Sequence, residues 1–402
     1  MTDLVLAIGV MTMVGLLGGL LAHRFKFPMV TGYIMVGILF SPSVFNVIPQ
    51  ATIDNLEVFT SIALGIIAYS IGSSLRFNLI RKLERSIAWI TPLQSLGAWF
   101  LTTLVIVLLI PLVLNIAEAT FWSTYFPIAF ILGAIASATA PAVVMAIVHE
   151  YRAKGPFTTT LLSVVGLDDA IAIISFTIAI SIVKPLIAVE SSFSGYEMLV
   201  PFLGIIESIA IGILLSLVLI YVAKLVKSRS MLLVIVLGII MLCVGISNLL
   251  EISSILANMV IGLIVVNMSK REELSLVIDD IEDFIFAMFF VLAGLHFNLG
   301  AMRSAGILAL LIVVSRFSGK YVGTAVGARL ASAPAIVRKY LGLALLPKAG
   351  VSIGLALLAQ SIFPTIGALI FNTVLASTII NELIAPPLAR YAIFKSGERH
   401  DE

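Results

Sequence analysis

Long apolar runs recur along almost the whole chain, and they restrict its fold more than any other feature. A helix that crosses a lipid bilayer needs about 20 consecutive apolar residues. Of the 402 residues, 60% are hydrophobic and 11% are charged, whereas soluble domains average about 45–50% apolar and about 25% charged residues. The sequence therefore predicts an all-α, polytopic integral membrane protein with a single membrane domain over residues 1–402. We expect about thirteen membrane-spanning helices, at roughly residues 3–22, 28–45, 56–75, 86–115, 126–149, 157–185, 198–223, 231–249, 252–268, 282–300, 304–327, 339–361 and 366–394.

The positive charges in the connections predict the orientation. Most of the 24 lysines and arginines lie in alternate connections, whereas the other set of connections holds only Lys184 and Arg303. The positive-inside rule then places the N-terminus outside and the C-terminus in the cytoplasm. A net charge of +2 without a basic block gives no sign of nucleic acid. The single cysteine, Cys243, lies in an apolar run, so the sequence predicts neither a disulfide framework nor a zinc site.

A few charged residues lie inside the predicted spans, where each is costly. The stretch SVVGLDDAIAIISF places Asp168 and Asp169 side by side in the middle of a span, and Glu382 lies in the last span. A charge at mid-bilayer costs about 2.5 kcal/mol or more, so such residues indicate a functional site. The basic residues at comparable depth are Arg316, Lys320 and Lys348.

Two of the predicted spans carry interruptions. The fifth contains SATAPA at residues 137–142, and the twelfth contains LPKAGVS at residues 346–352. Proline removes a backbone donor and disfavours helix in the residue before it. In each case the following span carries a buried acid, first Asp169 and then Glu382. Paired broken helices of this kind indicate inverted repeats around a midplane binding site, here on either side of the seventh span.

The eleventh span supplies the opposite charge. In SRFSGKYVGTAVGARL, Arg316 and Lys320 are four residues apart and share one helix face. Glycines at the same spacing allow a neighbouring helix to approach closely. We expect Lys320 or Arg316 to lie beside Asp168 and Asp169. The alternative is a fixed ion pair that only holds the helices together.

These residues resemble the second family of monovalent cation/proton antiporters. FKFPMVTGYIMVGILFSP is similar to that family's second span, VGLDDAIAI to its ion-binding motif, and IEDFIFAMFFVLAGLHFNL to its tenth span. The pattern K-x-x-G-x-x-x-G that begins at Lys320 resembles its basic helix opposite the aspartates. The resemblance implies a homodimer with a scaffold from about residues 1–80 and 231–300. It also implies a transport core from about residues 86–185 and 304–394, joined by a linker helix at about residues 198–223.

The resemblance implies exchange of sodium, with lithium as a further substrate, against protons. We assign Asp169 as the main sodium ligand and Asp168 as the proton carrier partnered by Lys320. Thr139 and Ser137 are candidate further oxygen ligands. The pair of acids titrates as a unit, and exchange of two protons for one sodium would be electrogenic. The transported ions are substrates, and no cofactor is expected.

Several alternatives stay open at this point. Lys348 occupies a break where relatives carry arginine or no charge, which leaves sodium and potassium both open as the exchanged ion. A sodium-coupled symporter of an organic anion is a second alternative. An intramembrane aspartyl protease needs two aspartates from different helices, and Asp168 and Asp169 are neighbours on one helix, so we expect no enzyme. The expected setting is a bacterial or archaeal plasma membrane, with a role in pH homeostasis.

Overall fold

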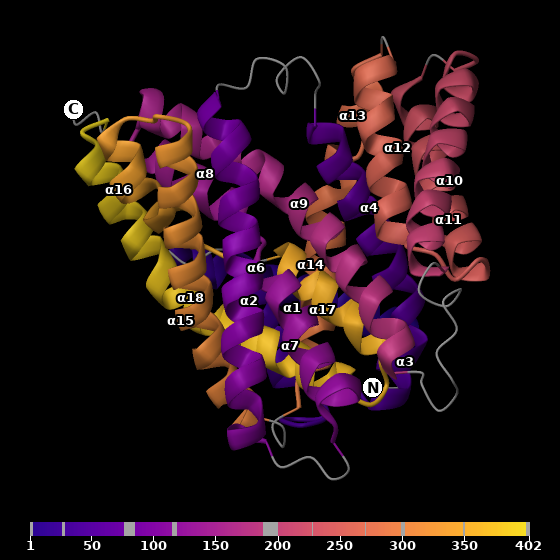
Figure 1. Cartoon of the computed structure of the whole chain (residues 1–402). Helices are drawn as coiled ribbons and strands as arrows, with labels where there is room; N and C mark the ends of the chain where they lie inside the picture. Colours follow the sequence, from indigo (N-terminus) through magenta and orange to yellow (C-terminus); the bar gives the residue numbers. More distant parts are fainter. Residues whose placement is uncertain are drawn as a thin grey trace. The chain divides into compact units, whose positions relative to one another are not determined.

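The computed structural model describes residues 3–25, 29–75, 85–114, 119–187, 200–226, 228–269, 271–298, 302–348 and 350–398. These residues form helices and the connections between them, without a strand in the described ranges (Figure 1). By contacts the chain divides into two units. Unit 1 comprises Met1–Arg81 and Ser194–Leu299, and unit 2 comprises Lys82–Phe193 and Gly300–Glu402.

Unit 1 is built from helices at the start and in the middle of the chain. They are α1 (Leu4–Arg24), α2 (Met29–Phe40), α3 (Gln50–Asn55), α4 (Glu57–Ser74), α10 (Val200–Ala223), α11 (Arg229–Leu249), α12 (Ser254–Met268), α13 (Glu273–Leu276) and α14 (Asp279–Leu295). Helix α4 packs on α12, and α2 packs on both α1 and α14. Helix α10, which corresponds to the expected linker, packs against α11 and α12 within this unit.

Unit 2 contains two groups of helices with the same internal order. The first group is α6 (Arg85–Val113), the short π-helical turn η1 (Phe121–Tyr125), α7 (Phe126–Ala136), α8 (Pro141–Glu150) and α9 (Pro156–Ile187). The second group is α15 (Met302–Leu330), α16 (Ala335–Ala344), α17 (Gly350–Ile362) and α18 (Gly367–Ser396). Each group therefore runs from a long helix through a broken pair to a second long helix, as the predicted repeats require.

Both predicted interruptions are present. Helix α7 ends at Ala136 and α8 begins at Pro141, whereas α16 ends at Ala344 and α17 begins at Gly350. Proline suits the first position of α8 because the missing N–H would have no partner within the helix there. Helix α9 likewise begins at a proline, Pro156. We call residues 137–140 the first break and residues 345–348 the second break.

The predicted spans all coincide with helices, but their exact number stays a prediction. Among the described residues, eight helices are long and apolar enough to cross a membrane, and four apolar helices are shorter. Helices α3 and α13 and the turn η1 are not part of the sequence prediction; all three have at most six residues. Residues 28, 115, 198–199, 299–300 and 349 of the predicted spans lie outside the described residues.

Helices α6 and α15 approach each other closely within unit 2, and glycines make this possible. A Cβ atom added at Gly323 would lie 2.8 Å from Gln94 Cα, and one added at Gly319 would lie 2.8 Å from Ala98 Cα. Any side chain at these positions would meet the backbone of α6. This contact is what brings Lys320, the residue after Gly319, within reach of the polar side chains of α6 and α9.

Candidate functional site

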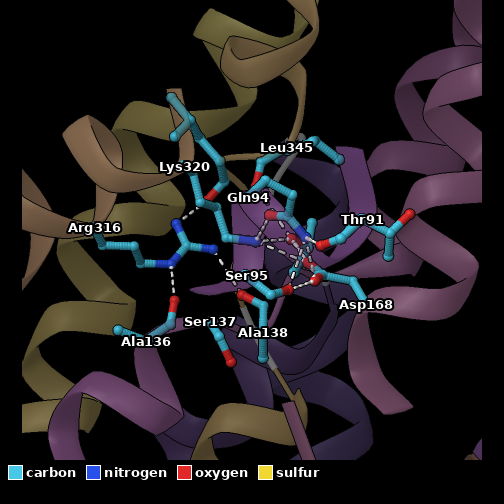
Figure 2. A network of polar contacts seen from close by, with 12 residues as sticks. Thr91, Gln94, Ser95, Ala136, Ser137, Ala138, Asp168, Arg316, Lys320 and Leu345 are labelled. Atoms are coloured by element: carbon cyan, nitrogen blue, oxygen red, sulfur yellow. Dashed lines mark hydrogen bonds and ion pairs between the residues drawn. The ribbon is translucent and has the colours of Figure 1, made fainter. Parts of the chain in front are cut away.

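The centre of the site is the carboxylate of Asp168, which is buried on α9 and accepts hydrogen bonds from four side chains (Figure 2). Its Oδ1 accepts from Gln94 Nε2 and from Ser95 Oγ, both on α6. Its Oδ2 accepts from Thr139 Oγ1 in the first break and from Lys320 Nζ. A carboxylate offers about four lone-pair positions, so these donors fill the hydrogen-bonding capacity of Asp168.

Lys320 is the cation paired with Asp168. Its Nζ lies 2.7 Å from Asp168 Oδ2, and neither side chain is exposed. The ammonium also donates to Gln94 Oε1 at 2.7 Å and to Thr139 Oγ1 at 2.6 Å. An ammonium carries three N–H groups, and here each has an acceptor. A buried pair is stable only when its remaining hydrogen bonds are satisfied in this way.

Asp169 is the next residue on α9 and has very different surroundings. Successive residues of an α-helix point about 100° apart, so the second carboxylate faces another direction. Asp169 is 5% exposed. Its Oδ1 is buried and has no hydrogen-bond partner among the described residues. The two neighbouring acids thus differ, one with its acceptor positions filled and the other with an oxygen left available.

Arg316 does not take the place of Lys320 beside the aspartates, although it lies one turn away on α15. Its guanidinium donates to the carbonyl oxygens of Ala136 at 2.8 Å and Ala138 at 2.7 Å in and before the first break. It also donates to the carbonyl oxygen of Leu346 in the second break, at 2.6 Å. Figure 2 shows the guanidinium next to Ala136 and Ala138, with Lys320 turned towards Gln94 and Asp168.

The two breaks are therefore joined at one point. The C-terminal end of a helix leaves carbonyl groups without partners inside the helix, and this end carries partial negative charge. The guanidinium of Arg316 satisfies carbonyl groups of both breaks, and the backbone N–H of Ala140 donates to the carbonyl oxygen of Pro347 at 2.9 Å. Asn381 on α18 adds a hydrogen bond from its Nδ2 to Leu346 O, at 3.1 Å. The interrupted backbone is thus covered by protein groups, which a membrane interior requires.

The remaining predicted site residues lie apart from the Asp168 network. Ser137 donates its hydroxyl hydrogen to Ala134 O at 2.7 Å, within its own helix turn. Lys348 is 1% exposed and donates to Ser377 Oγ at 3.2 Å. Glu382 is 5% exposed, and neither of its carboxylate oxygens has a hydrogen-bond partner in the described part of the chain.

The sequence interpretation missed the contribution of α6. Gln94 and Ser95 both contact Asp168, and Gln94 Nε2 also donates to Thr91 O at 3.1 Å. These side chains are neutral, so a search for buried charges passes over them. Adjacent polar residues in the middle of an apolar span would have been a usable signal, because such side chains tend to hydrogen-bond between helices.

A buried acid–base pair beside two interrupted helices is typical of one class of protein, the secondary transporters, whose binding sites lie between such repeats. Comparison with known proteins specifies the class further. Residues 9–391 match the transmembrane sodium/hydrogen exchanger family. The chain belongs to this family, and monovalent cation/proton exchange is the activity of its class. The predicted membership among monovalent cation/proton antiporters and the all-helical antiporter fold are thereby confirmed, whereas assignment to the second of these antiporter families stays a prediction.

Individual relatives agree with this assignment. The chain is 26% identical to the Na⁺/H⁺ antiporter NhaS4 of Synechocystis, over 96% of this chain and 97% of the relative. It is 25% identical to the high-affinity Na⁺/H⁺ antiporter NhaS3 of the same organism, over 58% of this chain and 51% of the relative. Its fold is similar to that of the sodium/proton antiporter MjNhaP1 from Methanocaldococcus jannaschii. That comparison gives a TM-score of 0.74 and 18% identity, with 98% of each chain covered.

Proposed function

We propose that this protein is a secondary antiporter that exchanges sodium, and also lithium, for protons by alternating access. The observation that carries the proposal is the contrast between the two neighbouring acids. Asp168 is held by Lys320 and three further donors, whereas Asp169 has a buried oxygen without a partner among the described residues. A hard cation that prefers oxygen ligands could bind at Asp169 and then compete with Lys320 for Asp168.

The exchange follows from that competition. When sodium binds between the carboxylates, Asp168 turns from the ammonium towards the ion, and the proton of Lys320 and any proton on Asp169 are released. When protons return, the Lys320–Asp168 pair forms again and the ion leaves. The hydroxyl of Thr139 contacts both Asp168 and Lys320 when the pair is formed, and we assign it as a further oxygen ligand when sodium is bound. Sodium and protons thus occupy the site in turn.

We assign the moving part of the protein to the transport core of residues 86–185 and 304–394. The described residues of the site, from Gln94 to Glu382, lie within unit 2, which supports this assignment. Residues 1–80 and 231–300 would form the scaffold and the contact between two copies of the chain, with residues 198–223 linking the parts. If two protons exchange for one sodium, one net charge crosses the membrane in each cycle, and transport is electrogenic.

The test uses purified protein in liposomes that contain a pH-sensitive dye. Sodium and lithium gradients should drive proton movement in the wild type, and a potassium gradient should drive less.

Asp169→Asn should abolish this movement because it removes the charge that binds the ion. Glu207→Gln, at an exposed acid on α10, is the matched control and should exchange at the wild-type rate. Movement driven by potassium alone would favour a potassium/proton antiporter. Wild-type rates in Asp169→Asn would refute the assigned ligand.

We further propose that the protein is a homodimer in a bacterial or archaeal plasma membrane, where it serves pH homeostasis. The N-terminus would lie outside and the C-terminus in the cytoplasm, as the loop charges indicate. The similarity to the Synechocystis antiporters supports the setting. Labelling of single cysteines placed at the two ends of the chain, in a variant without Cys243, tests the orientation in intact cells.

A further inference from the structure

A carboxylate near the end of the chain covers the beginning of the helix that carries both aspartates. Glu398 accepts hydrogen bonds from the backbone N–H groups of Phe157 at 2.7 Å and Thr158 at 2.8 Å, one through each carboxylate oxygen. These amides belong to the first turn of α9, where no carbonyl of the same helix can reach them. A negative charge at this end of a helix is also favoured by the helix dipole.

The connection before α9 is shaped to receive this carboxylate. Gly155 stands where a capping side chain normally lies, and it has none; its φ of 156° is one that other residues rarely adopt. A Cβ atom at Gly155 would fall on the carboxyl group of Glu398. Glu398 thus supplies the cap from a position 241 residues further along the chain than Phe157.

Further contacts attach the end of α18 to the same connection. The backbone N–H of Lys154 donates to the carbonyl oxygen of Glu398 at 3.0 Å. The Arg390 guanidinium lies 5.0 Å from the ring centres of both Tyr151 and Phe394, and these two rings meet edge to face at 4.9 Å. Helix α18 ends in a left-handed residue, Gly397, which turns Glu398 back towards α9. We call these contacts between residues 151–158 and 390–398 the C-terminal clasp.

We propose that Glu398 is a positioning residue for the ion site: through the C-terminal clasp it fixes α9 against α18 and so sets the place of Asp168 and Asp169. This inference rests on the proposed function. Helix α9 is continuous from Pro156 to Ile187, so the cap and Asp168 lie about 17 Å apart along one rigid element. Because binding sites need their groups held within about 0.5 Å, a shift of α9 at its start changes the competition between sodium and Lys320.

The experiment compares sodium-driven proton movement in liposomes for the wild type and Glu398→Ala. We expect the sodium concentration for half-maximal rate to rise by up to about fivefold, the factor reached if the whole free energy of a typical lost helix cap is transferred to sodium binding, with an unchanged maximal rate. Glu398→Gln should recover part of the effect, because its amide oxygen can accept one of the two N–H bonds. Arg338→Ala, which removes an exposed charged side chain on α16 outside the C-terminal clasp, is the matched control and should behave as wild type.

The cap can also be disrupted by a substitution at Gly155, which lies against the carboxyl group of Glu398. Gly155→Ala should displace the carboxylate and raise the half-maximal sodium concentration. Combined with Glu398→Ala it should add less than its own single effect, because the contact is already lost and only the backbone strain of an alanine at position 155 is added. Hydrogen exchange at the amides of Phe157 and Thr158 should become faster in both variants. This readout does not depend on transport and reports on the cap alone.

The outcomes separate the inference from the proposed function. If Glu398→Ala lowers the maximal rate but leaves the half-maximal sodium concentration unchanged, Glu398 contributes only to folding, and the inference is overturned. Unchanged amide exchange in Glu398→Ala would show that the cap does not form in the membrane. If the wild type itself shows no cation-driven proton movement, the proposed function is wrong. The role of Glu398 in ion binding is then wrong as well, whether or not hydrogen exchange at Phe157 and Thr158 changes.

Discussion

At the scale of single residues, the proposed exchange depends on two adjacent acids with unequal partners. Asp168 is surrounded by Gln94, Ser95, Thr139 and Lys320. An ion that takes Asp168 must therefore replace several hydrogen bonds as well as one charge. This requirement favours a small, hard cation, because its attraction for carboxylate and hydroxyl oxygens is strong enough to replace those hydrogen bonds. It also makes Lys320 the residue whose replacement says most about coupling.

Lys320→Gln should destabilise the protein by about 3–5 kcal/mol, because the carboxylate of Asp168 loses its cation in a buried place. Lys348→Gln is the matched control: this lysine is equally buried, and its described partner is the hydroxyl of Ser377. It should cost much less. Thermal unfolding of the purified proteins measures both. Equal losses would mean that the pair with Asp168 contributes nothing beyond the burial of a lysine.

The same variant tests whether the lysine carries a proton. If Lys320 releases a proton in each cycle, Lys320→Gln should still exchange sodium for protons but lose its response to an imposed membrane potential. If it only holds the helices together, the response to potential should survive while the stability falls.

At the scale of helices, proline alone does not decide where a helix is interrupted. Pro92 and Pro111 lie inside α6, and Pro386 and Pro387 lie inside α18, without ending either helix. The interruptions occur at Pro141 and Pro347, where partners for the freed backbone groups exist in Arg316, Asn381 and the opposite break. The sequence motifs SATAPA and LPKAGVS predict both breaks correctly because small and polar residues accompany the proline there. The role of Arg316 as the common partner depends on tertiary contacts, which no local pattern contains.

The contact between α6 and α15 gives a prediction at this scale. Gly323→Ala should destabilise the protein by about 1–3 kcal/mol, because the added methyl group meets the backbone of α6. Gly306→Ala, in the same helix, meets nothing within 4 Å and should stabilise the protein by up to about 1 kcal/mol through helix propensity. Thermal unfolding of the two variants should shift in opposite directions. A loss of the same size in both would show that helices α6 and α15 tolerate a wider separation.

At the scale of the whole molecule, the sequence predicts the architecture better than the site. Apolar runs long enough to cross a bilayer predict the long helices correctly. A segment inside the membrane needs apolar side chains, and its backbone groups must form hydrogen bonds within the helix. Charged residues inside those runs are costly, and for that reason the sequence predicts Asp168, Asp169 and Lys320 as candidate site residues. The sequence does not predict the roles of Gln94, Ser95 and Glu398. Gln94 and Ser95 contact Asp168, and Glu398 contacts the start of α9, only because the folded chain brings them together.

Charge movement is the prediction that belongs to the whole molecule. If two protons exchange for one sodium, each cycle moves one net charge, which is worth about 2.3 kcal/mol per 100 mV. An imposed potential across the liposome membrane should then accelerate sodium-driven proton movement at one polarity and slow it at the other. If the rate of sodium-driven proton movement does not change with the membrane potential at any pH, the exchange is one proton for one sodium.

The position of Arg316 also bears on how the protein is made. This residue satisfies carbonyl groups at Ala136 and Ala138, yet it follows Ala136 in the chain by 180 residues. A ribosome that has just delivered the first broken helix to the membrane has not yet synthesised the side chain that completes it. Until α15 is inserted, the carbonyl groups of Ala136 and Ala138 need other hydrogen-bond partners, because unpaired backbone groups are costly inside a membrane. The first break can therefore reach its final form only after helix α15 has entered the membrane.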